Sequence, residues 1–404
     1  MSSVTSSPTS FKRNAEPATR ASSPEFELLL ACCALDGGSA AAGDLPTRLE
    51  GVLDWPQLLS LAEHHNVLPL VHQALRGYSA IVPHAVNEQL RTEYELNARR
   101  NLKFTAELFR VLDCLETTAI PAIPFKGPLL AELVYEDLSL RAFSDLDVLV
   151  RPNDVLRAET ALQTLGYTLS SQFPGAMKHA YLASGYEFTL DGPAGANLLE
   201  IQWNILPKFY AVDFNCGEFF ERSVTTTLGG RPVRSLSSED LLLVLCVHAA
   251  KHAWIRLCWL RDIAGVMQSQ TLHWEFIEQR SRELGIQRIV SVSLRLANQL
   301  LGAKVPHSAI AMTSTDRDVA RKSEQVVREL AAADEYSSES LQYFRLMLGL
   351  RERARDKLRF LFRLAFTPSI GEWEVVRLPA PLFPLYRIIR LFRLAGRLSR
   401  SRAG

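Results

Sequence analysis

Two aspartates one residue apart stand inside an apolar run, in the segment Ser144-Asp145-Leu146-Asp147-Val148-Leu149-Val150. Side chains alternate between the two faces of a β-strand, so Asp145 and Asp147 are expected to point the same way while the apolar residues between them point toward a core. Two carboxylates side by side on a half-buried face repel each other unless a cation lies between them or one of them takes up a proton. The pattern therefore predicts a strand that holds a divalent metal ion.

A second pair of aspartates with the same spacing, Asp316-Arg317-Asp318, provides a comparison within the chain. It has no apolar alternation and stands at the expected start of a helix, where acidic side chains interact favourably with the helix dipole. The D-x-D spacing alone is therefore unspecific, and the residues around Asp145 and Asp147 decide the interpretation.

Cationic and hydroxyl side chains precede the acidic strand. Lys126-Gly127 stands at an expected strand-to-helix turn, where glycine lets the backbone approach a ligand and the amides of the following helix can face an anion. Arg141 can bind a phosphate through two parallel hydrogen bonds, and Ser144 can donate one more. These residues predict a phosphate site; the alternative is a plain helix entry with a surface lysine and a surface arginine.

A third acidic residue lies in the later apolar segment Asn197-Leu198-Leu199-Glu200-Ile201-Gln202-Trp203. Glu200 shares a strand face with Gln202, and a glutamate in an apolar strand needs a partner. If this strand neighbours the first, Glu200 joins Asp145 and Asp147 as a third carboxylate. The alternative is a glutamate on an edge strand that faces water.

Taken together, four motifs resemble those of the uncharacterised bacterial nucleotidyltransferase family, within the polymerase-β-like nucleotidyltransferase superfamily. They are K-G-x-x-L, S-D-L-D-V-L-V, L-E-I-Q-W and H-A-A-K-H-A-W-I-R-L-x-W-L-x-D-I, and the resemblance covers roughly residues 25 to 300. It implies an α+β fold, with a small mixed-sheet nucleotidyltransferase core flanked by N-terminal and C-terminal helical regions. The Gly-Ser that precedes the aspartates in the wider superfamily is replaced here by Lys126-Gly127, and the third acid is glutamate rather than the commoner aspartate.

The resemblance also implies a chemistry for these residues. Asp145 and Asp147 would bind two Mg²⁺ or Mn²⁺ ions that hold the triphosphate of an NTP, and Glu200 would be a further metal ligand or the base for the acceptor proton. The cations of Lys126 and Arg141, with the Gly127 amide and Ser144, would contact phosphate. His248, Lys251 and His252 would face the cleft and contact nucleotide or acceptor.

The two histidines have further interpretations. His248 and His252 have the helical spacing of a zinc site, but no glutamate follows His248 as in H-E-x-x-H and no third ligand is evident. They could also pack between helices. The neighbouring Trp254 and Trp259 are expected to be core residues, and Asp262 is expected to pair with Lys251 or Arg261.

The expected reaction moves a nucleoside monophosphate from an NTP to an acceptor hydroxyl and releases pyrophosphate. One alternative is a catalytically degenerate module of the same fold that binds a nucleotide or a partner protein. Another is a toxin-type transferase that acts on tRNA. The sequence specifies neither the acceptor nor the base of the NTP.

Composition and patterning predict five regions. Residues 1–24 are rich in Ser, Thr and Pro and are expected to be disordered, without a secretory signal. An N-terminal helical region (25–117) precedes the nucleotidyltransferase core (118–235), a helical domain that closes the cleft (236–335) and basic C-terminal helices (336–404). The expected elements are helices at 85–116, 128–135, 153–165, 257–268, 274–284, 288–301, 316–333, 338–364 and 385–398, an edge strand at 120–125, further strands at 143–150, 186–190 and 198–203, and a hairpin at 223–233.

The net charge of +1 conceals an uneven distribution, because residues 351–404 hold thirteen Arg and Lys against four Asp and Glu. Arg387, Arg390, Arg393 and Arg397 have helical spacing in the last segment. They are expected to be solvated while the apolar face of this helix packs on the protein; peripheral contact with an anionic membrane surface and contact with RNA are the alternatives. The cysteines indicate a reduced, cytoplasmic protein, and no apolar run reaches the length of a transmembrane helix.

Overall fold

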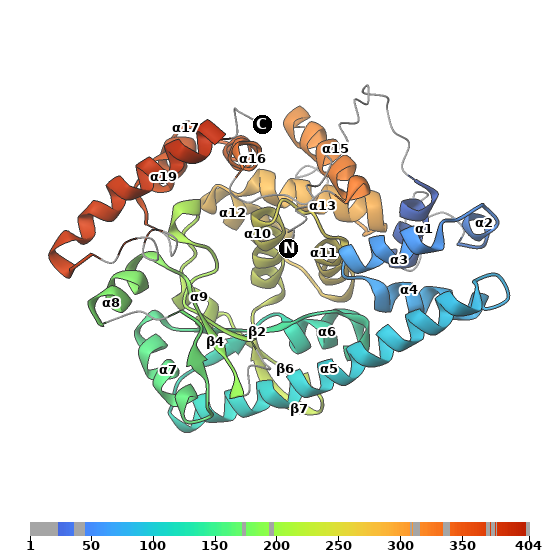
Figure 1. Ribbon diagram of the computed structural model, residues 1–404, viewed down its shortest axis with the longest axis horizontal. Coiled ribbons are helices and arrows are strands. Elements are labelled where there is room, and N and C mark those ends of the chain that lie inside the picture. Colours follow the sequence, from blue (N-terminus) through green and yellow to red (C-terminus); the bar gives the residue numbers. More distant parts are fainter. Residues whose placement is uncertain are drawn as a thin grey trace, which may run out of the picture.

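The computed structural model describes residues 23–35, 45–171, 175–193, 198–307, 309, 316–333, 340–368, 372, 376 and 378–400. A mixed five-stranded sheet lies among helices (Figure 1), which confirms the expected α+β fold class. The strands have the spatial order β1-β2-β5-β4-β3. Their bounds are β1 Ala122–Pro124, β2 Asp145–Val150, β3 Thr168–Leu169, β4 Glu187–Asp191 and β5 Leu198–Gln202.

The register of the central strands decides which polar side chains meet. β2 and β5 are parallel neighbours, and Asp147 is the direct partner of Glu200. β4 runs antiparallel to β5 on the other side, where Glu187 is the partner of Gln202. Acidic residues from three strands therefore share one region of one sheet face.

The opposite face of the sheet packs on a long helix. Leu146, Val148 and Val150 are buried there against α5 (His84–Thr117) and α7 (Val155–Gln163), which confirms the expected alternation along β2. Helices also cover the acidic face, so Asp147 is only 3% exposed. The strand is therefore buried on both faces rather than half-buried as the sequence pattern suggested.

Helices α10 (Ser238–Lys251), α11 (Leu257–Ser269) and α13 (Gln287–Leu301) pack together above the sheet (Figure 1). Ser237 caps α10, because its hydroxyl accepts a hydrogen bond from the Asp240 amide at 3.2 Å, as the pattern Ser237-Ser238-Glu239-Asp240 before an apolar run predicts. α11 packs on α6 (Gly127–Tyr135) with unusually close approach, since a Cβ at Gly265 would lie 2.0 Å from a methyl carbon of Val134. This contact brings α11 over the edge of the acidic face.

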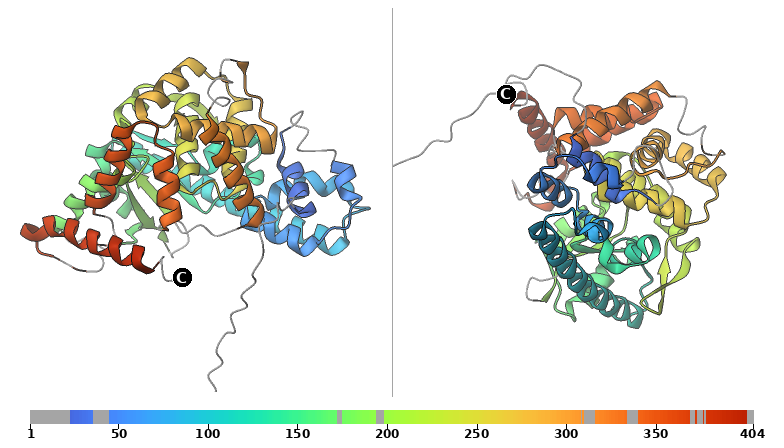
Figure 2. Two further views of the ribbon diagram at one scale, coloured as in Figure 1. Left: turned by 90° about the horizontal axis from the view of Figure 1, so that it is seen from above. Right: turned by 90° about the vertical axis from the view of Figure 1, so that its right-hand side faces the viewer.

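Further helices precede and follow these elements in the sequence. Helices α1 to α4 lie at the opposite end of the molecule from the last helix, α19 (Figure 2). The described chain begins at Ser23, so the segment expected to be disordered lies almost wholly outside it, and the division into five regions stays a prediction. The remaining bounds are α1 Pro24–Cys33, α2 Leu45–Leu49, α3 Trp55–His64, α4 Leu68–Leu75, α8 Gly175–Ser184, α9 Cys216–Glu221, α12 Trp274–Leu284, α15 Arg317–Ala332, α16 Leu341–Gly349, α17 Ala354–Phe366, η6 Ala380–Leu385 and α19 Tyr386–Arg400.

Most expected elements are confirmed, including the edge strand β1 and a hairpin of β6 (Val224–Leu228) and β7 (Arg231–Ser235). The expectation of one continuous helix over 338–364 is wrong. The chain forms α16 and α17 instead, because Arg351 between them is buried and donates from Nη2 to the carbonyl of Tyr210 at 2.6 Å. Residues 338 and 339 lie outside the described part. None of the described helices combines the length and apolar character that a membrane crossing requires.

The last helix differs in part from its expected orientation. Arg390 of α19 is buried and forms an ion pair with Glu372 at 3.1 Å, and Arg393 pairs with the same carboxylate at 2.7 Å. The apolar side chains of Ile388 and Phe392 are exposed instead. The expectation of solvated arginines is therefore wrong for Arg390 and Arg393, because a buried carboxylate attracts their guanidinium groups inward. Arg387 is exposed as expected, and Ile389 is partly buried against Tyr386.

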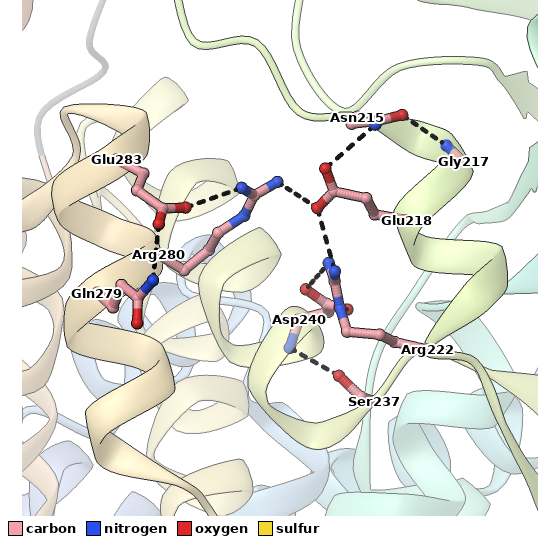
Figure 3. Close-up of polar contacts among 9 residues, drawn as sticks. All are labelled: Asn215, Gly217, Glu218, Arg222, Ser237, Asp240, Gln279, Arg280 and Glu283. Atoms are coloured by element: carbon pink, nitrogen blue, oxygen red, sulfur yellow. Dashed lines mark hydrogen bonds and ion pairs between the residues drawn. The ribbon is translucent and has the colours of Figure 1, made fainter.

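A polar network fixes α10 to the neighbouring helices α9 and α12 (Figure 3). Arg222 donates from Nε and Nη2 to the two carboxylate oxygens of Asp240 at 2.9 and 3.0 Å, and it also contacts Glu218. Arg280 of α12 reaches Glu218 at 2.6 Å. Since Asp240 is buried and lies in the first turn of α10, the network determines where that helix begins.

We expect Asp240→Ala to lower the free energy of unfolding by about 3 kcal/mol, because it leaves the half-buried Arg222 without its bidentate partner. Urea denaturation followed by circular dichroism measures the change. Glu283→Ala, which removes an exposed ion pair with Arg280 from the same network, is the control and should leave stability nearly unchanged. Equal effects of the two substitutions would contradict this account of the network.

Candidate functional site

A cavity of about 310 Å³ lies between the acidic face of the sheet and helices α10 and α11. All but one of the residues expected to form the site line it, the exception being Gly127. The lining residues that the sequence predicted are Lys126, Arg141, Ser144, Asp145, Asp147, Glu200, His248, Lys251 and His252. Residues from three distant segments of the chain therefore converge on one cavity.

The carboxylates on the sheet are connected by two hydrogen-bond donors. Lys126 Nζ lies 2.7 Å from Asp147 Oδ1. Gln202 donates from Nε2 to the same oxygen at 2.9 Å and to Glu200 Oε2 at 3.0 Å. One ammonium and one amide thus hold together two acids that would otherwise repel each other.

The pKa values of the acids show that their charge is only partly compensated. Burial, together with the nearby carboxylates of Asp147 and Glu187, raises the pKa of Glu200 to about 9. Burial and Asp147 likewise raise the pKa of Asp145. The pKa of Lys126 is raised because the acids outweigh the opposing effect of its own burial. A further cation would stabilise the ionised carboxylates.

In the residues that the structure describes, no three His, Cys, Asp or Glu side chains are grouped closely enough to hold a metal ion. The acids converge as expected, but Lys126 and Gln202 occupy part of their coordinating capacity, so the three-carboxylate metal cage stays a prediction. The donor set nevertheless suits Mg²⁺, which binds one or two carboxylates together with substrate phosphates rather than an all-protein cage.

Gly127 has a structural role that the sequence indicated only in part. Its φ of 54° is in the left-handed region, and a Cβ there would lie 3.4 Å from the carbonyl oxygen of Asp145. Glycine thus lets α6 begin directly against β2 with Lys126 as its N-cap. A contact between the Gly127 amide and phosphate stays a prediction.

Arg141 does not offer the two parallel N–H donors that were expected to bind phosphate. Its Nε and Nη2 bind the carboxylate of Asp262 on α11 at distances of 2.9 to 3.2 Å, and Tyr135 donates to Asp262 at 2.8 Å. The expected pairing of Asp262 with Lys251 or Arg261 is therefore wrong. Only Nη1 of Arg141 is buried without a hydrogen-bond partner. That single donor is what the residue offers to a ligand in the cavity.

A wall of nitrogen-containing and aromatic side chains faces the acids. The His252 ring lies 4.9 Å from both the His248 ring and the Trp259 ring. Burial and the neighbouring cation of Lys126 lower the pKa of His248, and burial and Lys251 lower that of His252 to about 3. Both imidazoles are therefore neutral near pH 7, and zinc has no third ligand here among the described residues.

The turn between α10 and α11 positions this wall through strained backbone. Ala253 and Trp254 both have positive φ, which is uncommon for residues other than glycine. Trp254 is a core residue as expected, and its indole donates to the Ser293 hydroxyl at 2.9 Å. Trp259 is partly buried and packs against the core as expected, and it also lines the cavity.

Several lining residues were not among the expected site residues. Glu187, Gln202 and Tyr186 come from strand β4 and its neighbours, and Lys251 donates to the Tyr186 hydroxyl at 2.8 Å. Gln202 shares a face with Glu200, so the two-residue period could have indicated it. Nothing local marks Glu187, since its place depends on the pairing of β4 with β5. Asn66, on the loop before α4, is likewise found only through the tertiary fold.

A mixed sheet with acids on adjacent strands, and with cations on the walls of the same cavity, is the arrangement that the resemblance to nucleotidyltransferases predicted. The chain belongs to the uncharacterised nucleotidyltransferase family, whose model matches residues 52–302. This confirms the family resemblance seen in the sequence motifs.

Two solved structures are similar to part of the chain. Both are of the antibiotic-resistance factor ANT(2'')-Ia, one in solution and one in a crystal with adenylyl-2''-tobramycin. Each has 14% sequence identity, a TM-score of 0.34 and a match to 45% of this chain, covering 91% and 97% of the respective structure. A likeness at this level assigns no substrate. No curated protein matches the chain.

We expect Arg141→Lys to lower the free energy of unfolding by about 3 kcal/mol, because lysine cannot form the bidentate contact and leaves the buried Asp262 poorly paired. Denaturant unfolding measures the loss. Arg157→Lys, at an exposed pair with Asp154 on α7, is the matched control and should change little. If Arg141→Lys were as stable as the parent protein, the structural role given to Arg141 would be wrong.

The pKa of His252 predicts a stability that depends on pH. A histidine whose pKa is lowered in the folded protein stabilises the fold above its ordinary value of 6.5, and this contribution is lost as the pH falls toward 3. Between pH 7 and about pH 5, His252 should account for a loss of about 2 kcal/mol. Urea unfolding at both pH values should show a smaller loss for His252→Gln than for the parent protein. His84→Gln, at an exposed position on α5, should leave the pH dependence unchanged.

Proposed function

We propose that the chain is a Mg²⁺-dependent nucleotidyltransferase that moves a nucleoside monophosphate from an NTP to an acceptor hydroxyl and releases pyrophosphate. The observation that supports this most strongly is the pairing of Asp147 with Glu200 across β2 and β5, on the wall of a cavity that also contains Lys126 and Lys251. Acids and cations that line one cavity can bind a metal and a polyphosphate at once.

In this proposal, Asp145 and Asp147 hold Mg²⁺ or Mn²⁺ together with the phosphates of the nucleotide. The bound ion would offset phosphate charge and lower the pKa of the acceptor hydroxyl. Lys126 leaves Asp147 for the phosphates, which are its stronger anionic partners once a divalent cation has neutralised the carboxylates. Lys251 and the free Nη1 of Arg141 contribute further positive charge from the other walls of the cavity.

The reaction needs a base for one proton. The acceptor oxygen forms a bond to the α-phosphorus, the bond from that phosphorus to the bridging oxygen breaks, and the electrons of that bond leave with pyrophosphate. Glu200 would take the hydroxyl proton only with a cation bound beside it, because burial and the neighbouring carboxylates together raise its pKa to about 9 and otherwise keep it protonated near pH 7. Trp259 and His252 lie beside one another at the cavity and offer flat surfaces to a nucleobase.

A specific observation favours the alternative of a degenerate binding module. Asp147 accepts hydrogen bonds from both Lys126 and Gln202, so in the structure an ammonium takes the place that a metal would have. In a degenerate module this ion pair would be permanent. The two proposals differ in whether Mg²⁺ strengthens nucleotide binding: a transferase needs the metal at Asp147, whereas a degenerate module with a permanent ion pair does not.

Asp145→Asn combined with Asp147→Asn should abolish pyrophosphate release and lower nucleotide affinity in the presence of Mg²⁺ by about tenfold or more. The measurements are an enzyme-coupled pyrophosphate assay over a panel of NTPs and hydroxyl acceptors, and calorimetric titration of each NTP with Mg²⁺ or with EDTA. The parent protein should bind at least one NTP more tightly with Mg²⁺ than with EDTA.

The chain offers a matched control in its second D-x-D. Asp316→Asn with Asp318→Asn removes two carboxylates of the same spacing that pair with Arg288 at the start of α15, away from the cavity. This variant should retain nucleotide binding and transfer. Nucleotide binding that is equally strong with EDTA, and unaffected by the substitutions at 145 and 147, would favour the degenerate module and contradict the transferase.

A further inference from the structure

The C-terminal helices form a second cavity. Most of its residues are distant in sequence from those of the acidic site. We name this cavity the C-terminal groove. It has a volume of about 970 Å³ and lies between α8, α17, η6 and α19. Its lining consists of Ala180, Ala183, Ser184, Lys208, Arg359, Phe362, Arg363, Phe366, Thr367, Pro368, Phe383, Pro384, Arg387 and Ile388.

Apolar side chains around this groove are exposed to an unusual degree. Phe362 is 65% exposed, Leu358 on the same helix is 68% exposed, and Phe392 on α19 is 74% exposed. Most of the large exposed apolar side chains in the described part of the chain lie between Leu358 and Phe392. Contiguous apolar surface of this kind marks an interaction site.

The orientation of α19 makes this exposure more significant. A surface helix ordinarily packs its apolar side on the protein and solvates its charges. Here Arg390 and Arg393 turn inward to Glu372, and Ile388, Leu391 and Phe392 face outward on one side of the helix. Figure 2 shows α19 at an outer end of the molecule, remote from the N-terminal helices, where this side can meet a large partner.

The charge of the groove specifies the kind of partner. Four of the described residues that line it are cationic, namely Lys208, Arg359, Arg363 and Arg387, and none of them is acidic. Arg359 and Arg363 share the carboxylate of Asp213, which leaves the cations in excess. A surface with exposed phenylalanine and leucine beside arginine matches the boundary between acyl chains and anionic headgroups.

We propose that the C-terminal groove and the outer side of α19 bind the surface of an anionic phospholipid bilayer. Phe362 and Phe392 enter the acyl boundary, and Lys208 and Arg387 contact the headgroups. RNA would need a row of free cations along the phosphates, and Arg390 and Arg393 are already paired with Glu372. This contact is peripheral and independent of the transferase chemistry.

The test is co-sedimentation of the full chain with vesicles of phosphatidylcholine alone, or of phosphatidylcholine mixed with an equal amount of phosphatidylglycerol. Binding is expected only to the anionic vesicles and is expected to weaken in high salt. Phe362→Ser combined with Phe392→Ser should weaken binding by about tenfold or more, since each removes a large apolar side chain from the membrane contact. Arg387→Glu should also weaken it.

The long helix α5 supplies matched controls. Leu102→Ser, at a 62% exposed position, and Arg99→Glu, at an exposed arginine, should leave vesicle binding unchanged. Circular dichroism melting checks that every variant is folded. The proposal is overturned if the parent protein ignores anionic vesicles, or if the double phenylalanine variant binds them as well as the parent protein does. It is also overturned if the exposed side chains instead hold two copies of the chain together, or if the groove binds single-stranded RNA but no vesicles.

Discussion

The fold of this protein depends on the compensation of two like charges, those of Asp147 and Glu200, in the centre of a sheet. Parallel pairing of β2 with β5 places Asp147 directly opposite Glu200, and the structure covers both with helices. Such a pair is stable only if cations or protons compensate it. Lys126 and Gln202 provide part of that compensation, and the raised pKa of Glu200 shows that part of it is still lacking. The site therefore has a physical reason to take up a cation.

The surrounding elements are arranged around this constraint. Gly127 lets α6 start against β2, which brings Lys126 to Asp147. The bidentate pair of Arg141 with Asp262 joins the loop before β2 to α11. It therefore fixes the helical side of the cavity to the side that the sheet forms. The network at Asp240 fixes the start of α10, which contributes His248 and Lys251. Cations that pair with acids in this way stabilise the cavity. Few of their N–H groups therefore stay free to donate hydrogen bonds to a ligand.

In the last helix, α19, ion pairs rather than the hydrophobic pattern decide which side faces the protein. Its arginines were expected to lie in water, but Glu372 draws two of them inward, and the apolar side of α19 becomes the exposed one. The helical period of the segment predicted its structure correctly. It could not predict which side faces the protein, because that choice depends on a carboxylate that precedes the helix in the chain and is buried against it.

The sequence by itself determined the local features: the alternation along β2, the cap of α10 at Ser237, the hairpin of β6 and β7, and the family, because propensity, period and motif are properties of neighbouring residues. It also indicated nine of the residues that line the cavity, among them three of its four acids. Only the tertiary structure decided that Glu187 and Trp259 join them, that Arg141 binds Asp262, and that Lys126 rests on Asp147. Those choices depend on strand register and helix packing between distant segments, where the energy of an ion pair depends on burial and geometry that no local pattern contains.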